Sequence, residues 1–157
     1  MAELLIGRQY LSEVPAIIED AKERVRVAMF LAQVQSRTSK MTSRVMCEKL
    51  WAKAREGVDV RVLLNNAGGG VRVPAVNRDT ARWLQDRGVK VKNLGPGHTC
   101  HAKFVIVDEL CVVIGSHNWT PYSLRDNFEV SVLISEASTV RRLVDYFDAL
   151  WEISKEF

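Results

Sequence analysis

Helical and strand-like patterns of apolar residues alternate along the first 94 residues of the chain. Apolar residues at helical spacing occupy residues 11–24, 41–56 and 78–87, and short apolar runs occupy residues 3–7, 25–32, 58–64 and 89–94. Gly57 and Gly88 are placed to end two of the helices, and Asn77 is placed to cap the last one. Connected units of this kind predict an α/β domain with a mixed, mostly parallel central sheet flanked by helices on both faces.

The pattern changes after the glycine-containing segment 95–100. Two apolar runs, residues 101–108 and 111–118, are separated by only two residues, which is too short for a crossover helix. They therefore predict an antiparallel hairpin. An alternating strand over residues 127–134 and an amphipathic helix over residues 136–154 complete the pattern.

Length and composition fit one globular domain that spans residues 1–157. Hydrophobic residues make up 47% and charged residues 26% of the chain, which excludes a disordered or fibrous protein. No run approaches the roughly 20 apolar residues of a membrane span, and the N-terminus lacks a secretory pattern, so we expect a cytoplasmic protein. The net charge of +3 favours anionic partners without distinguishing nucleic acid from phospholipid.

The predicted hairpin brings four polar side chains together if its turn holds an even number of residues. Paired residue numbers then add up to 219, so His101 faces Asn118 and Lys103 faces Ser116. The spacing of two within each pair puts all four side chains on one face. Gly115 would let a ligand approach the backbone closely. A turn with an odd number of residues would shift the register and remove this arrangement.

These four residue types suit the cleavage of a phosphodiester bond without a metal ion. A neutral imidazole at His101 can act as a nucleophile or a proton carrier. The Lys103 ammonium supplies positive charge to the non-bridging oxygens, and the Ser116 hydroxyl and Asn118 amide add hydrogen-bond donors. The sequence therefore predicts His101 and Lys103 as catalytic residues, with phosphate bound by Lys103, Ser116 and Asn118.

The predicted site lacks an acid that could protonate the leaving oxygen. A histidine that attacks phosphorus cannot donate this proton at the same moment, and His98 and His117 occupy positions that face away in an extended chain. A twofold dimer would bring two copies of His101 together, because a C2 axis places the same residue on both sides of the interface. We therefore expect a homodimer with its active site at the twofold axis.

The spacing of these residues resembles the HKD signature of the phospholipase D superfamily. The resemblance rests on His101-x-Lys103-x4-Asp108, on Gly115-Ser116-x-Asn118 and on Asn127-Phe-Glu129. Residues 89–134 resemble the small bacterial single-HKD nucleases of that superfamily, and the preceding apolar runs fit the same family. Larger members carry more than one HKD copy, whereas this chain carries one, so catalysis by an isolated monomer is not expected.

The resemblance implies a phospholipase D-like fold and a covalent phosphohistidine intermediate on one His101. The second His101 is implied to protonate the leaving oxygen and later to activate water, with no metal ion and no other cofactor. Glu129 is implied to hydrogen-bond a catalytic histidine and orient it. For Asp108 we expect a structural hydrogen-bonding role, because it lies an odd number of residues from His101 and faces away from the phosphate.

Nucleic acid, either DNA or RNA, is the expected substrate, because the resemblance is to small nucleases and basic residues are placed to flank the site. Arg37, Lys40 and Arg72 are predicted to line a substrate groove. A phospholipase or headgroup transferase is the alternative, although no apolar amphipathic segment suits a bilayer surface. A non-catalytic scaffold that binds nucleic acid is a further alternative.

A metal site is the remaining alternative for the histidines of this region. His98, Cys100 and His101 are ligand types that could hold a metal ion. No fourth ligand follows at a recognised spacing, so we reject this interpretation.

Overall fold

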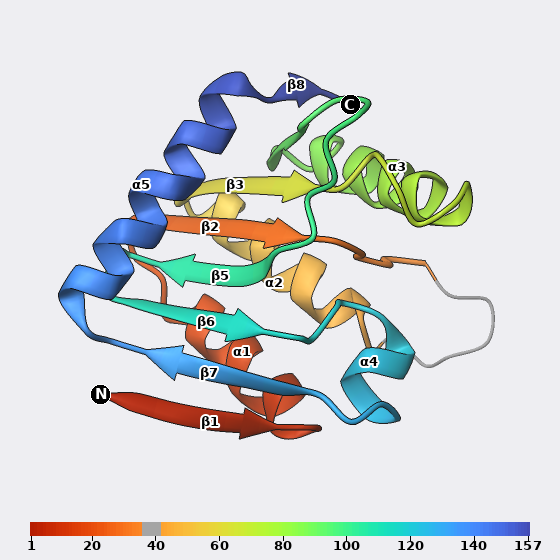
Figure 1. Cartoon of the computed structure of the whole chain (residues 1–157). Helices are drawn as coiled ribbons and strands as arrows, with labels where there is room; N and C mark the ends of the chain where they lie inside the picture. The colour runs from red at the N-terminus through yellow and green to blue at the C-terminus, as the bar shows by residue number, and fades with distance from the viewer. Residues whose placement is uncertain (36–41) are drawn as a thin grey trace.

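The structure, a computed structural model, describes residues 1–35 and 42–157. Within them an eight-stranded sheet lies between two layers of helices (Figure 1). One face carries α1 (Gln9–Glu19), α2 (Arg44–Arg55) and α3 (Arg72–Gln85), the other carries α5 (Ala137–Ile153), and the short α4 (Pro121–Arg125) lies beyond the strand ends. The strands are β1 (Ala2–Ile6), β2 (Arg24–Met29), β3 (Asp59–Leu64), β4 (Lys90–Asn93), β5 (Lys103–Val107), β6 (Cys111–Gly115), β7 (Val130–Ile134) and β8 (Lys155–Glu156).

The predicted α/β class and the flanking helices are confirmed, but the sheet is not mostly parallel. Its order is β1-β7-β6-β5-β2-β3-β4-β8. Among the described strands only β2 with β3 and β3 with β4 pair in parallel, and the other five pairings are antiparallel. The parallel pairs follow the helical crossovers through α2 and α3, whereas β5, β6 and β7 are joined without long crossovers and so reverse direction.

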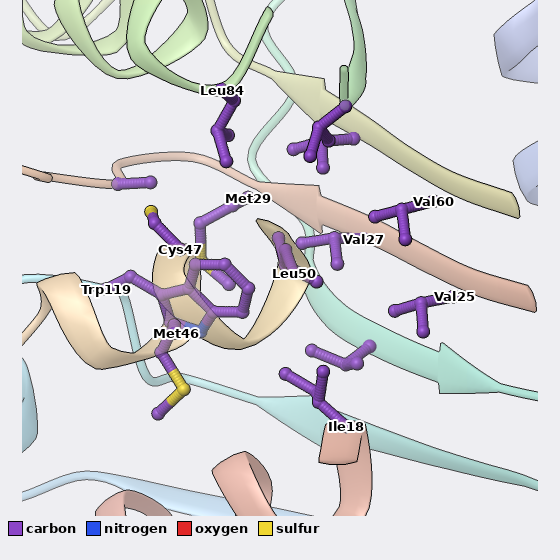
Figure 2. Packing of buried hydrophobic residues seen from close by; sticks show 14 of the residues in the cluster. Ile18, Val25, Val27, Met29, Met46, Cys47, Leu50, Val60, Leu84 and Trp119 are labelled. Atoms are coloured by element: carbon purple, nitrogen blue, oxygen red, sulfur yellow. The ribbon is translucent and has the colours of Figure 1, made fainter. Parts of the chain in front are cut away.

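Two apolar clusters hold the helices to the sheet. Val25, Val27 and Met29 of β2 point toward α1 and α2, where they pack near Ile18 and Leu50 (Figure 2). On the opposite face, fully buried aromatic and aliphatic side chains of β5 and β6 pack against α5. Strands buried on both faces explain why these runs are continuously apolar rather than alternating.

The register of the β5–β6 hairpin differs from the prediction by one residue. Phe104 pairs with Ile114 and Val107 with Cys111, so paired numbers add up to 218 instead of 219. The turn holds three residues, 108–110, and the first two have positive φ angles of 51° and 56°. Asp at the first position tolerates this conformation better than most residues do. The predicted pairing of the four polar side chains on one face is therefore wrong.

One edge of the sheet collects the segments that carry the predicted site. β2, β3 and β6 end at this edge, and β5 and β7 begin there, as Figure 1 shows on the right-hand side. The chain segments that leave or enter these strands therefore meet at one place, and α4 lies against them.

Candidate active site

His101 and Lys103 lie at the start of β5. His101 is exposed, whereas Lys103 is only 9% exposed. The Nζ atom of Lys103 donates to the His101 carbonyl oxygen at 2.5 Å and lies 3.4 Å from His101 Nδ1. Burial lowers the pKa of the Lys103 ammonium, although Cys100 and Glu129 nearby act in the opposite direction. An accessible imidazole therefore lies beside a partly desolvated positive charge.

Ser116 and Glu129 are joined where β6 ends and β7 begins. Ser116 Oγ donates a short hydrogen bond to Glu129 and accepts the Val130 N–H at 3.1 Å. The other Glu129 oxygen accepts from Ser123 Oγ at 2.9 Å and from Asn127 Nδ2 at 3.3 Å. Burial alone would raise the pKa of Glu129, but these hydrogen bonds together hold it below its ordinary value. Glu129 is therefore a carboxylate fixed in place by three side-chain donors.

The predicted role of Glu129 in orienting a histidine stays a prediction. Within the described part of a single chain, the carboxylate of Glu129 makes its side-chain hydrogen bonds to serine and asparagine and none to His101. The Ser116 hydroxyl donates to Glu129 here, so its predicted donation to a phosphate requires this bond to rearrange.

Asn118 is fixed by the backbone of the segment that follows β2. Its Oδ1 accepts the Leu31 N–H at 3.2 Å, and its own N–H donates to Ser123 Oγ at 2.8 Å. With Oδ1 used in this way, the amide nitrogen of Asn118 is the group that remains to donate to a ligand. The donation from Asn118 to a phosphate stays a prediction.

His117 points away from these residues, as its position in an extended segment predicts. It is fully buried and stacks on Tyr10 with ring centroids 4.4 Å apart. Its ring nitrogens lie 2.8 Å from Ser131 Oγ and 3.0 Å from the Gly7 carbonyl oxygen. His117 therefore has a packing role behind the strand.

The two halves of the motif meet at the sheet edge without the predicted pairing. β5 begins at Lys103 and β6 ends at Gly115, so His101, Ser116 and Asn118 lie outside the regular ladder. The alternation of faces along a strand does not fix side chains beyond its end. The common edge, rather than a shared hairpin face, brings the predicted residues into one region.

Gly115 allows β6 and β7 to pack closely together. A Cβ at this position would overlap the side chain and Cα of Ser131 and the Val130 carbonyl oxygen. Only glycine allows β6 and β7 to approach this closely next to the site. This contact agrees with a structural role, and it replaces the predicted approach of a ligand as the reason for the glycine.

Asp108 directly follows the C-terminal end of β5 and binds the backbone where β2 begins. Its carboxylate accepts the N–H groups of Lys22, Glu23 and Arg24 at 2.7, 2.8 and 2.8 Å. Burial raises the pKa of Asp108, but these three donors outweigh it and the pKa lies below its ordinary value. These hydrogen bonds are what a structural role requires, and that role stays a prediction.

Asp108→Asn is expected to lower the free energy of unfolding by about 2 kcal/mol at pH 7, because the bonds lose their ionic acceptor. Asn tolerates the positive φ angle, so the change leaves the turn unstrained and removes the charge together with one of the two accepting oxygens. The native pKa is depressed, so the penalty is complete above the unfolded pKa near 4 and fades as the pH falls through the lower native value. Urea unfolding at pH 7 and at pH 3 measures this difference, and an equal penalty at both would contradict it.

Of the predicted groove residues, Arg72 is the one that the structure describes. Arg37 and Lys40 lie outside the described residues. Arg72 is the exposed first residue of α3. The loop before it is packed close to the site, because a Cβ at Gly68 would meet Thr99 Oγ1 at 2.9 Å. Arg72 is therefore placed near the active edge, and contact with substrate stays a prediction.

Two buried polar residues of the site region were not identified from the sequence. Ser123 on α4 links Asn118 to Glu129, but residues 119–126 showed only a loop or short helical turn. Asn77 was predicted to cap a helix, and this is wrong, because α3 begins at Arg72 and Asn77 is buried within it. For Asn77, the only sequence signal of burial was its position as a lone polar residue on an apolar helical face.

The described residues contain neither a cluster of metal ligands nor a helix that could span a membrane. Over residues 1–35 and 42–157, no three His, Cys, Asp or Glu side chains cluster in a way that could hold a metal ion. No helix in the same part of the chain combines the length and apolarity needed to cross a bilayer.

Comparison with known proteins identifies the family. The family model described as "Cardiolipin synthase, PLD-like domain" matches residues 14–151. The chain belongs to the phospholipase D superfamily. This phospholipase D-like chain has the fold of Nuc from Salmonella typhimurium, with a TM-score of 0.81 and 18% identity over 100% of this chain and 99% of that one. NucT from Helicobacter pylori gives 0.78 and 17% over the same shares.

A curated relative of this phospholipase D-like chain has a name that refers to a lipid. The human mitochondrial cardiolipin hydrolase is 32% identical over 97 residues, which are 57% of this chain and 38% of that protein. The chain thus spans less than half the length of this relative. Family and fold are shown by these comparisons, and the choice of substrate is a separate question.

Proposed function

We propose that this phospholipase D-like chain hydrolyses phosphodiester bonds of nucleic acid without a metal ion, through His101. The observation that carries the proposal is the exposed imidazole of His101 beside the buried ammonium of Lys103, at the edge that also holds Ser116, Asn118 and Glu129. A nucleophile next to fixed positive charge and oriented donors is what transfer of a phosphoryl group requires.

The proposed reaction has two steps. In the first, an imidazole nitrogen of His101 forms a bond to phosphorus while the bond to the leaving oxygen breaks, and that oxygen takes a proton from the partner subunit's His101. In the second, the now neutral imidazole of the partner subunit's His101 takes a proton from water, and the resulting hydroxide displaces the histidine nitrogen from phosphorus. Each histidine ends in the protonation state in which it began.

The remaining residues stabilise charge on the phosphoryl oxygens. Lys103 offers its ammonium, and Asn118 offers its amide nitrogen because Leu31 occupies its oxygen. Glu129, ionised and held by Ser116 and Ser123, supplies a fixed negative charge at the same edge of the sheet. These roles need no group other than side chains of two identical chains.

The proposal requires a homodimer, and an apolar sheet surface beside the site suits a second copy. Residues Leu4, Ile6, Ile114, Val130, Val132 and Ile134 alternate onto one face of β1, β7 and β6. Leu4, Ile6 and Val130 are 60%, 57% and 50% exposed. A single chain rarely leaves a contiguous apolar sheet face in water, so such a face marks an interaction surface.

The position of this face favours a copy of the same chain as its partner. The face continues into a hollow of about 530 Å³ that includes Leu143 and Tyr146 of α5. At the site end, Val130 follows directly after Glu129, and Phe128 before it is fully exposed. A twofold axis through this end would bring the two copies of His101 toward each other, which supplies the missing acid.

Leu4→Asp is expected to produce a monomer whose activity is lower on the order of 100-fold, because it buries a charge in the interface and removes the acid. Sedimentation velocity and cleavage of bis(p-nitrophenyl) phosphate measure both effects. Ile153→Asp, at an exposed apolar position at the end of α5, is the matched control and should remain dimeric and active. A fully active Leu4→Asp monomer would contradict the dimer.

Subunit mixing gives a second test of the shared site. When a fixed amount of wild type is mixed with increasing His101→Ala chain, activity should fall as one-histidine dimers replace active ones. The double variant Leu4→Asp/His101→Ala cannot enter dimers and should leave the activity unchanged. Constant activity in both mixtures would show that each chain works alone.

Nucleic acid is proposed over lipid because Nuc and NucT match the chain over 99% of their own length, whereas the cardiolipin hydrolase is matched over 38% of its length. The exposed Arg72 near the active edge also suits a polyanion. A phospholipid is the second candidate substrate, favoured by the description of the family and by the name of that relative.

Parallel assays of one protein preparation distinguish the two substrates. A fluorescent single-stranded or duplex oligonucleotide should be cleaved, whereas vesicles that contain cardiolipin or phosphatidylcholine should release no headgroup. Turnover of the vesicles alone would overturn the nucleic-acid proposal and leave the phosphodiesterase intact. Oligonucleotide binding without turnover of either substrate would favour the non-catalytic scaffold.

A further inference from the structure

The chain segment that follows β2 contacts both halves of the candidate site. The phenyl ring of Phe30 lies 4.7 Å from the imidazole of His101, between ring centroids, and the Lys103 ammonium lies 5.1 Å from the centre of the same ring. One residue later, the Leu31 N–H donates to Asn118 Oδ1. A single short segment therefore touches the residues from β5 and those that follow β6.

This segment is itself held rigidly from two sides. The buried Asn77 of α3 donates to the Phe30 carbonyl at 2.8 Å and accepts the Ala32 N–H at 3.0 Å. On the other side, the backbone N–H of Trp119 donates to the Leu31 carbonyl at 2.9 Å, and an isolated β-bridge joins Trp119 to Ala32. Asn77 also donates to the Asn65 carbonyl at 2.7 Å, which ties the segment to the end of β3.

The ring of Phe30 is supported from behind by glycine. A Cβ at Gly69 would meet the Phe30 ring at 3.1 Å and Val73 at 2.7 Å, so only glycine leaves the ring its present position. Gly70 has nearly the same positive φ, 66° against 67°, but a Cβ there would meet nothing within 4 Å. The two neighbouring glycines thus differ in what a Cβ would meet, although their φ angles are nearly the same.

We propose that Phe30 is a positioning residue that fixes the imidazole of His101 relative to the Lys103 ammonium. Residues 30–32 then hold His101 and Lys103 in a fixed position relative to Asn118. The inference rests on the proposed phosphodiesterase function. A tilted aromatic contact restrains the imidazole plane, and the face of the ring favours the charged form of the lysine. A shift of about 1 Å in either group is enough to cost on the order of 100-fold in rate.

Phe30→Leu keeps an apolar side chain but removes the ring, and it is expected to lower kcat about 10- to 100-fold with KM nearly unchanged. Without the ring, the Lys103 ammonium loses a stabilising contact, so the alkaline limb of the pH–rate profile should move to lower pH. The assay is hydrolysis of bis(p-nitrophenyl) phosphate in excess EDTA. Phe147→Leu changes a buried aromatic residue of α5; it is the matched control and should reduce thermal stability without moving the pH profile.

Gly69→Ala and Gly70→Ala test the same inference without changing Phe30. Gly69→Ala should lower kcat about as much as Phe30→Leu, whereas Gly70→Ala should keep kcat within about twofold. An active wild type with an unchanged kcat and pH profile in Phe30→Leu would overturn the inference and leave the proposed function standing. An inactive wild type would instead refute the proposed function itself.

Discussion

Replacing His101 by alanine is expected to lower the rate of phosphodiester cleavage by at least about 10³-fold, because the covalent step loses its nucleophile and the dimer loses its acid. Hydrolysis of bis(p-nitrophenyl) phosphate at saturating substrate measures the change. The free energy of unfolding should stay within about 0.5 kcal/mol of wild type, since the side chain is exposed. The effect therefore lies in the chemistry and not in folding.

A covalent adduct provides an independent check of the same variant. Reaction with a labelled oligonucleotide, stopped rapidly in alkaline detergent that preserves a phosphorus–nitrogen bond, should leave label on wild type and none on His101→Ala. His98→Ala changes an exposed histidine three residues away and should keep both activity and adduct. Undiminished turnover in His101→Ala would show that another residue attacks the phosphate.

Lys103→Met is expected to lower kcat by about 10²- to 10³-fold, which is the usual effect of removing a group that stabilises transition-state charge. The methionine retains length and apolar contact with Phe30 but has no charge. Lys22→Met, on an exposed lysine near Asp108 at the other end of the sheet, controls for the change in net charge and should be fully active. Equal losses in both variants would contradict a specific role for Lys103.

The pKa of Lys103 also gives this group a signature in the pH profile. Burial lowers that pKa, so the ammonium loses its proton at a lower pH than an exposed lysine does. Activity that needs the charged form should therefore decline on the alkaline side earlier than an ordinary lysine would allow. Lys103→Arg keeps the charge to higher pH, so its remaining activity should lack this alkaline decline.

The elements of the fold followed from the sequence because their patterns are local. Helical spacing and the glycines Gly57 and Gly88 marked α2 and α3, and both glycines have positive φ as expected for residues that end helices. The sheet directions were harder, since continuous apolar runs indicate burial on both faces and do not show how strands pair. The expectation of a mostly parallel sheet failed for that reason.

The structure brings the predicted site residues to one edge of the sheet, but the geometry that the sequence predicted for them was wrong, and their roles stay predictions. The β5–β6 register depends on whether the turn holds two or three residues, and Asp108 fixes it at three through bonds to residues 22–24, more than 80 positions away. No local pattern contains that contact. Phe30 was likewise part of an apolar run, and only the tertiary structure placed its ring against His101.

The most direct test of the central claim is cleavage of labelled single- and double-stranded DNA and RNA in excess EDTA by wild type and by His101→Ala. The account predicts that wild type cleaves at least one of these polymers at a rate that the chelator does not change, and that His101→Ala does not. Cleavage that stops when EDTA is added, or that survives in His101→Ala, would contradict it.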